Sequence, residues 1–138
     1  MKIIFYSDTG NTEKMAYLIK EGIEQAGKSA DVINVSDVNV EDVLKDDILI
    51  LGCPSKGNEV LEESEFEPFI EEISTKVSGK KVALFGSYGW GDGEWMRDFE
   101  ERMKGYGCTI IDTPLIIQEE PEDDDENCIN LGKKIASV

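Results

Sequence analysis

The sequence contains no histidine, few basic residues and no long apolar run. Only 14 lysines and arginines stand against 30 aspartates and glutamates, which gives a formal net charge of −16. Such a surface disfavours nucleic acid and anionic membranes, because both require a basic face. No apolar run reaches the roughly 18 residues of a membrane span, and the chain enters a strand-like run at once rather than a signal peptide. We therefore expect a cytoplasmic protein that binds neither nucleic acid nor membrane.

The absence of histidine also limits the catalytic mechanisms and metal sites that the protein can have. It removes the commonest general base and a common ligand of zinc and haem. The three cysteines, Cys53, Cys108 and Cys128, show no CxxC spacing, and the first two lie in apolar runs. We interpret Cys53 and Cys108 as core thiols. We expect no metal site and no conventional acid–base catalysis.

The chain alternates regularly between short apolar runs and stretches in which apolar residues recur at helical spacing. Its 138 residues, 40% of them hydrophobic, fit a single globular domain over residues 1–138. Short, nearly continuous apolar runs are typical of strands covered on both faces. These runs lie at 2–6, 31–35, 47–53, 81–87 and 108–111, and the last continues past Pro114 as "LII".

Helical stripes of apolar residues separate these runs. They comprise Met15, Ile19, Ile23 and Ala26; Phe66, Phe69, Ile70, Ile73 and Val77; Met96, Phe99 and Met103; and Cys128, Leu131 and Ile135. A short helix is also expected at 40–44. The acidic run 119–126 is interpreted as a solvated loop and the start of a helix. The alternation predicts an α/β fold with a parallel sheet covered by helices on both faces. In such folds ligands bind beyond the carboxyl ends of the strands.

The loop after the first strand, "SDTGNT" at residues 7–12, carries small hydrogen-bonding residues and one glycine. Its amides can converge on an anion at the start of the next helix, and its side chains add donors. It lacks the GK[ST] ending of an ATP-binding loop and the GxGxxG of a dinucleotide site. A single terminal phosphate fits best. The alternative is a plain capped helix start.

Two further loops follow strands at the same predicted edge. They are "PSKGNEV" at residues 54–60 and "SYGWGDG" at residues 87–93. The glycines around Trp90 predict an exposed aromatic, although the same pattern fits a turn whose tryptophan enters the core. Trp95, at the start of a helical stripe, is the expected core tryptophan. Together the three loops suggest a planar aromatic ligand with a phosphate tail.

With these loops and this succession of five predicted strands, the whole chain resembles the flavodoxins, in particular the short-chain clostridial type. The resemblance implies a flavodoxin-like three-layer sandwich whose five-stranded parallel sheet has the order 2-1-3-4-5. It also implies non-covalently bound FMN and a low-potential one-electron carrier that replaces ferredoxin, not an enzyme. The acidic surface implies partners with basic faces, namely redox enzymes that also use ferredoxin. A monomer is expected.

The resemblance also assigns roles to residues. Ser7, Thr9, Asn11 and Thr12 match phosphate-loop positions, and Trp90 matches the aromatic that stacks on the flavin. Gly57 matches a residue whose peptide turns over during reduction, and Glu59 matches a carboxylate at the edge of the ring. The full expected cofactor-binding set is Ser7, Asp8, Thr9, Gly10, Asn11, Thr12, Pro54, Ser55, Lys56, Gly57, Asn58, Glu59, Ser87, Tyr88, Gly89, Trp90 and Gly91.

Three of these positions depart from the clostridial pattern. Asp8 stands where a small neutral residue is usual, Pro54 replaces a small polar residue, and Lys56 replaces an apolar side chain. A carboxylate facing a phosphate dianion would oppose binding. We therefore expect the Asp8 side chain to point into solvent while its amide joins the anion site. The Lys56 ammonium is expected close to the ring.

Two other functions remain to be weighed. An FMN-dependent NAD(P)H or quinone reductase would use the same cofactor, but it needs a nicotinamide site, and no GxGxxG is present. A phosphorelay receiver domain would need acidic residues after the first strand and an aspartate ending the third. Tyr6-Ser7 and Cys53-Pro54 stand there instead.

Overall fold

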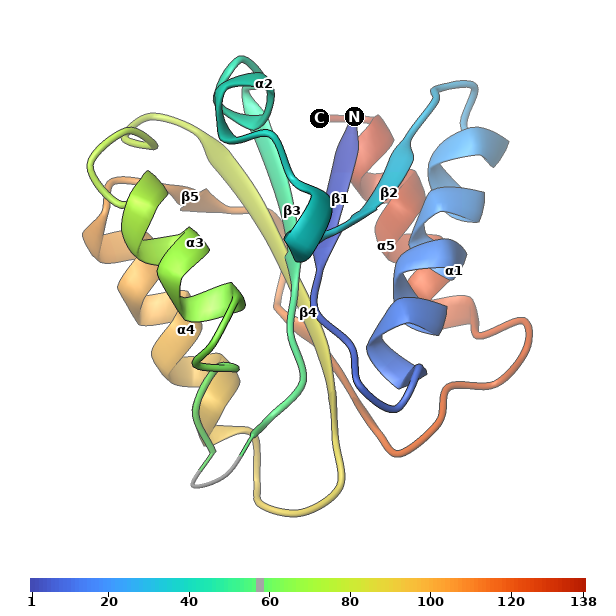
Figure 1. Ribbon diagram of the computed structural model, residues 1–138. Coiled ribbons are helices and arrows are strands. Elements are labelled where there is room, and N and C mark those ends of the chain that lie inside the picture. Colours follow the sequence, from blue (N-terminus) through green and yellow to red (C-terminus); the bar gives the residue numbers. More distant parts are fainter. Residues whose placement is uncertain (57–58) are drawn as a thin grey trace.

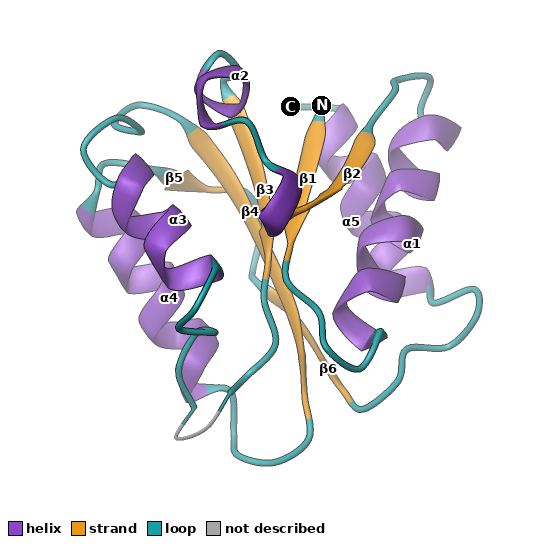
Figure 2. Cartoon of the chain, in the orientation of Figure 1, coloured by secondary structure: helices purple, strands orange, loops and turns teal. Residues whose placement is uncertain are grey.

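A computed structural model describes residues 1–56 and 59–138. Among these residues, six parallel strands form one sheet between two pairs of helices (Figures 1 and 2). The strands are β1 (Lys2–Phe5), β2 (Asp31–Asn34), β3 (Ile48–Gly52), β4 (Lys81–Tyr88), β5 (Thr109–Ile110) and β6 (Leu115–Gln118). The helices are α1 (Asn11–Gln25), α2 (Val40–Leu44), α3 (Phe66–Ile73), α4 (Glu94–Gly105) and α5 (Glu126–Ala136).

The sheet has the predicted order, β2-β1-β3-β4-β5. The predicted five-stranded sheet gains a sixth strand, because the fifth apolar run forms both β5 and β6. β5 pairs with the start of β4 and β6 with its end. Between the two strands, Asp112 adopts a left-handed backbone with φ 57°, and Pro114 has no amide hydrogen to donate. Pairing with β4 therefore stops at the end of β5 and starts again at β6.

The helices cover the two faces of the sheet in pairs. Figure 1 shows α3 and α4 on one side and α1 and α5 on the other, and each pair closes its own buried apolar cluster against the sheet. The apolar stripes identified in the sequence supply both clusters. The stripe at 66–77 extends beyond its helix, since α3 ends at Ile73 while Val77 is fully buried in the turn that follows.

Several smaller predictions are confirmed. The short helix at 40–44 is α2, and all three cysteines are buried free thiols. Trp95 is the core tryptophan; its side chain is 1% exposed and its Nε1 donates to the carbonyl of Cys53 at 3.1 Å. No helix within the described residues is both long and apolar enough to cross a membrane.

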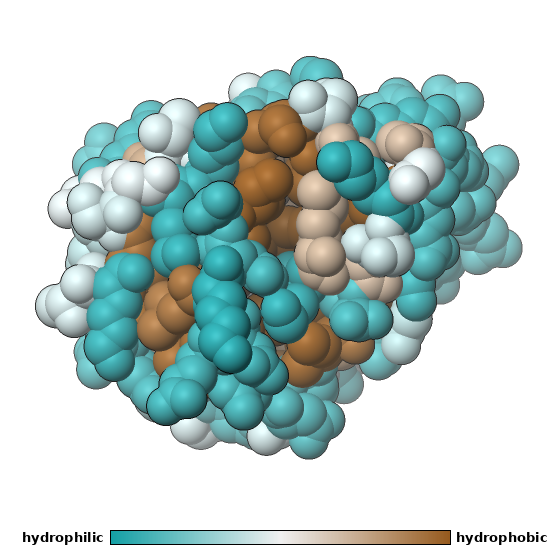
Figure 3. Space-filling model, turned by 90° about the horizontal axis from the view of Figure 1, so that it is seen from above, coloured by the Kyte–Doolittle hydropathy of each residue, from teal (hydrophilic) through white to brown (hydrophobic). Residues whose placement is uncertain are grey.

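The parallel strands give the molecule two different ends. The carboxyl ends of the strands point toward the lower side of Figure 1, and the two chain termini lie at the upper side. Seen from that upper side, hydrophilic residues surround smaller hydrophobic areas (Figure 3). The loops predicted to bind a ligand all lie at the lower end, opposite this surface.

Candidate functional site

A cavity of about 210 Å³ opens at the carboxyl ends of the strands, between the loops that follow β1, β3 and β4. It is lined by Asp8, Thr9, Asn11, Pro54, Ser55, Lys56, Ser87, Tyr88, Gly89 and Glu119. Nine of these ten residues belong to the set predicted from the sequence. A cavity of this size is smaller than the pockets that enclose a drug-sized ligand completely, so an aromatic ligand here stays partly exposed.

The first loop forms the start of α1. Its base is fixed because the Tyr6 amide donates to the carbonyl of Gly52 at 3.0 Å. The Ser7 hydroxyl accepts a hydrogen bond from the Gly10 amide at 3.0 Å, and Gly10 takes a left-handed backbone just before the helix. This turn brings several amides of the loop to the N-terminus of α1, which is 15 residues long. The arrangement suits an anion, because those amides and the helix dipole carry partial positive charge.

Thr12 lies in the first turn of α1 but faces the inside of the protein. Its side chain is fully buried, and its Oγ1 lies 2.8 Å from the Oγ of Ser87, which is also buried. The Ser87 amide donates to the same Thr12 oxygen at 3.4 Å. The hydroxyl that was expected to serve a phosphate therefore ties the first loop to the end of β4.

The second loop follows β3 and turns back on itself. Lys56 and Val60 form an antiparallel bridge in which each amide donates to the other carbonyl at 2.9 Å. The Ser55 amide donates to the carbonyl of Ser87 at 3.0 Å, and Pro54 is buried. Gly57 and Asn58, both predicted to contact the ligand, lie outside the described residues.

The most direct departure from expectation concerns Asp8 and Lys56. The Asp8 carboxylate was expected to point into solvent; the residue is exposed, but its Oδ2 also forms an ion pair with the Nζ of Lys56. The hydrogen bond from Lys56 lowers the pKa of Asp8, and the same bond raises the pKa of Lys56. Both groups are therefore charged at neutral pH, and the first two loops are joined across the cavity.

The third loop exposes a large aromatic side chain. Trp90 is 63% exposed, which excludes the alternative that it enters the core. Tyr88 packs instead against the buried Trp95, with 5.5 Å between the ring centroids. An exposed tryptophan beside a cavity offers a flat apolar surface for an aromatic ligand.

Glu59 does not line this cavity: it lines a separate one of about 140 Å³, and its carboxylate lies against Gly91 of the third loop. Its Oε1 is buried and, among the described residues, has no hydrogen-bond partner. A buried acceptor without a donor is costly, and a ligand N–H would supply the missing donor. Together with the anion site and the exposed Trp90, this acceptor fits a planar ring that has an N–H edge and carries a phosphate.

Two parts of this site were missed in the sequence. Glu119 lines the cavity; its amide donates to the carbonyl of Tyr88 at 2.8 Å, and its backbone is left-handed with φ 63°. It belongs to the acidic run 119–126, which composition alone marked as a solvated loop. The run is also held to α1, because Lys14 forms ion pairs with Glu120 at 3.1 Å and Asp123 at 2.7 Å.

Glu62 is the second residue that was missed, and it supports the loop that carries Glu59. Its buried carboxylate accepts hydrogen bonds from the amides of Ser64, Glu65 and Phe66 at 2.7–2.9 Å. Burial alone would raise its pKa, but the Ser64 hydroxyl and these amides outweigh burial and lower the pKa. The position of Glu62, four residues before the apolar residue that begins α3, was the available signal.

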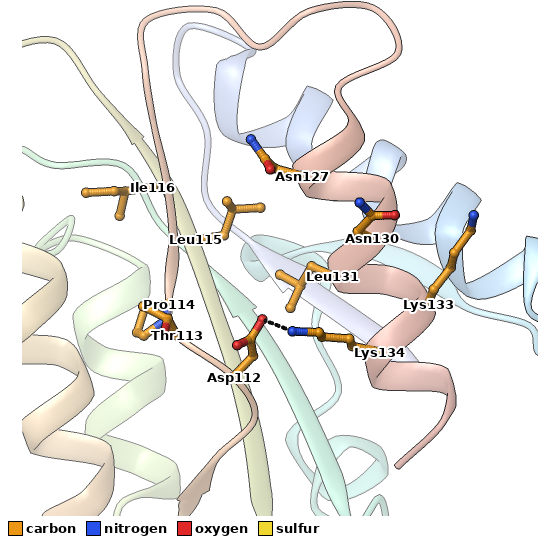
Figure 4. A pocket seen from close by; sticks show the side chains of 10 residues that line it. All are labelled: Asp112, Thr113, Pro114, Leu115, Ile116, Asn127, Asn130, Leu131, Lys133 and Lys134. Carbon is orange, nitrogen blue, oxygen red and sulfur yellow. Dashed lines mark hydrogen bonds and ion pairs between the residues drawn. The ribbon is translucent and has the colours of Figure 1, made fainter.

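A larger cavity, of about 760 Å³, lies elsewhere, between α5 and the segment that joins β5 to β6 (Figure 4). Figure 4 shows the Lys134 ammonium paired with Asp112, at 2.9 Å, on its wall. None of the predicted site residues lines it. Across the described part of the chain, no cluster of three or more potential metal ligands is present.

Comparison with known proteins agrees with this geometry. A sequence model of the family described as Flavodoxin matches residues 3–132. The chain is 69% identical to a flavodoxin from Clostridium beijerinckii over 138 residues, which is 100% of both chains. It is 44% identical to a flavodoxin from Megasphaera elsdenii, covering 100% of this chain and 99% of the relative.

Solved structures resemble it over the same length. The solution structure of two-electron reduced Megasphaera elsdenii flavodoxin matches with a TM-score of 0.89 and 43% identity, covering 100% of both chains. A flavodoxin from the domain Archaea matches with a TM-score of 0.88 and 31% identity, covering 99% of this chain and 97% of that one.

Proposed function

Because the chain belongs to the flavodoxin family, we propose that the cavity at the strand ends is where it holds the FMN with which it carries electrons. The protein is an FMN-binding electron carrier rather than an enzyme. When bound, FMN supplies the one-electron redox chemistry. The residues around the cavity bind and orient the cofactor and set the charge around it.

The observation that carries the assignment is the position of the cavity in the sheet. β1 lies between β2 and β3, so the order of the strands reverses direction there, and the cavity opens beyond the carboxyl ends of β1, β3 and β4. In open α/β sheets ligands bind at such a reversal. The larger cavity beside α5 does not have this position.

Three features around the cavity have complementary tasks in this proposal. The phosphate binds at the N-terminus of α1, beside the loop of residues 7–12. The exposed ring of Trp90 packs on the flavin. The Oε1 of Glu59, which has no hydrogen-bond partner among the described residues, accepts a hydrogen bond from an N–H on the edge of the ring. Incomplete enclosure leaves part of the ring accessible to a redox partner.

The redox partners are proposed to present basic faces. With a net charge of −16, the protein repels acidic surfaces and attracts basic ones, which speeds encounter at low ionic strength. The same charge opposes the addition of electrons at the cofactor, which favours a low potential. We further propose that the carrier is a monomeric single domain that works in the cytoplasm and serves redox enzymes that also use ferredoxin. A reductase function is less supported, since the full-length relatives are flavodoxins.

The test is to purify the protein, record its visible spectrum and identify the released cofactor. We expect yellow protein with one FMN per chain, quenched flavin fluorescence and no bleaching by NAD(P)H alone. Bleaching by NAD(P)H would favour the reductase, and colourless protein that does not take up added FMN would overturn the assignment.

A further inference from the structure

The ion pair between Asp8 and Lys56 joins two loops that are 48 residues apart in the sequence and face each other across the cofactor cavity. Both side chains line this cavity, and each is 37% exposed. The pair is thus partly shielded from water, so its charges act on the cavity more strongly than those of a fully exposed pair.

The backbone on both sides holds the two partners in place. Lys56 is fixed by its double hydrogen bond with Val60, at 2.9 Å in each direction. Asp8 follows Tyr6, whose amide is bound to Gly52, and lies in the turn that the Ser7 hydroxyl closes. The two backbones are therefore held at a fixed separation, so only the side-chain torsions of Asp8 and Lys56 are restricted when the pair forms.

Each charge alone would affect the cofactor. A free ammonium at this place would attract a phosphate dianion and would ease the second one-electron reduction, which adds negative charge to the site. A free carboxylate would do the opposite in both respects. Glu119 already contributes one carboxylate to the cavity wall, so a second one without a partner would weaken phosphate binding further.

We propose that Asp8 and Lys56 act as a charge-compensating pair at the mouth of the cavity: each cancels the effect of the other on FMN affinity and on the second one-electron potential. Asp8 is thereby a positioning residue, which acts on the cofactor through Lys56. The inference rests on the proposed function, because it requires FMN in this cavity. It also explains why a carboxylate in the first loop occurs together with an ammonium in the second.

The proposal predicts effects of opposite sign for the two single substitutions. In Asp8→Asn the bare ammonium should tighten FMN binding and raise the second potential. In Lys56→Met the bare carboxylate should weaken binding and lower that potential. For one unit charge at about 8–10 Å and an effective dielectric of about 40, we expect about a fivefold change in Kd in either direction. The double variant should return to within about twofold of the wild type.

The experiment compares the wild type, both single variants and the double variant. FMN is titrated into each apoprotein by fluorescence quenching at low and high salt, and both one-electron potentials of each holoprotein are measured. Riboflavin, which lacks the phosphate, is titrated in parallel to separate the effect on the phosphate from that on the ring. Lys134→Met serves as the matched control, because it removes a lysine from an ion pair on the other cavity.

The outcomes separate this inference from the proposed function. Opposite shifts that shrink with salt, a near-normal double variant and an unchanged control support the charge-compensating pair. Single variants that shift in the same direction, or that leave affinity and potential unchanged, overturn it while the wild type still binds FMN. A double variant whose FMN affinity differs from that of the wild type by clearly more than twofold overturns it as well. A wild type that binds no FMN overturns the proposed function itself.

Discussion

The carboxylate of Glu59 lies directly against Gly91, so the second and third loops of the site meet at these two residues. A Cβ built on Gly91 would stand 2.3 Å from Glu59 Oε1, far inside van der Waals contact. The backbone of Gly91 is also left-handed, with φ 90°. Glycine is therefore required here twice, by the backbone conformation and by the space that the carboxylate occupies.

We predict that Gly91→Ala will weaken FMN binding by about tenfold or more, because the added methyl group displaces the buried acceptor of Glu59. The left-handed backbone should also cost about 1–2 kcal/mol of folding stability. The measurements are FMN titration and chemical unfolding. Gly79→Ala is the control: its φ is 88°, but a Cβ there would meet nothing within 4 Å. It should lose comparable stability and keep its FMN affinity; equal losses of affinity in both variants would contradict the role given to Gly91.

Trp90 provides a second prediction. Replacing Trp90 with alanine should weaken FMN binding by about 1–3 kcal/mol, the range for stacking of a base on an aromatic ring. The apoprotein should keep its stability, because the side chain is 63% exposed and packs little against the core. Trp90→Phe retains an aromatic surface and should recover part of the affinity and of the fluorescence quenching. If the alanine variant binds and quenches like the wild type, Trp90 does not contact the flavin.

Glu62 makes stability depend on pH. Its folded-state pKa lies below the ordinary value of 4.5, so the ionised carboxylate stabilises the folded chain. This contribution is complete above the unfolded pKa, near pH 4.5, and is lost as the pH falls through the lowered value. We therefore expect Glu62→Gln to cost roughly 1–3 kcal/mol at pH 7, with a smaller difference from the wild type at acidic pH.

Urea unfolding of holoprotein at several pH values measures this difference. Glu63→Gln is the matched control, since Glu63 is exposed in the same turn, and it should change stability by less than about 0.5 kcal/mol. A gap between Glu62→Gln and the wild type that stays constant from pH 7 to the acid transition would show that ionisation of Glu62 does not support α3.

The sequence was informative wherever a feature depends on local pattern. Apolar runs and helical stripes predicted the parallel sheet, and the resemblance to the flavodoxins implied its strand order. Loops that follow strands of a parallel sheet meet at one edge, and the site set that the resemblance implied contains nine of the ten residues that line the cavity. The split of the last strand was harder to foresee. Its apolar residues continue past Pro114, and only the left-handed Asp112 reveals the break.

Pairings between distant residues left no such pattern. Asp8 and Lys56 are 48 residues apart, and each looked like an isolated exception until the fold brought them together. Thr12 was assigned to the ligand because its loop suggested it, but helix geometry turns its hydroxyl inward to Ser87. Glu119 is exposed, as its acidic neighbours suggested, but it also lines the cavity. In each case the direction of a side chain depends on packing that composition does not record.

The last prediction concerns the packing of α1 against α5. α1 and α5 approach so closely at Gly22 and Gly132 that a Cβ on Gly132 would stand 2.1 Å from the carbonyl oxygen of Ile19. A Cβ on Gly22 would likewise stand 2.0 Å from the carbonyl oxygen of Ile129. Both contacts are with backbone atoms, which cannot rotate away as a flexible side chain can.

We therefore expect Gly132→Ala to destabilise the holoprotein by about 2–3 kcal/mol through overpacking, despite the better helix propensity of alanine. Gly105→Ala, at the end of α4, is the control, because a Cβ there meets nothing within 4 Å and no left-handed backbone is required. It should be neutral or should gain up to about 1 kcal/mol. Chemical unfolding at saturating FMN measures both variants. If Gly132→Ala is as stable as Gly105→Ala, the two helices can move apart at little cost, and their close packing does not contribute to stability.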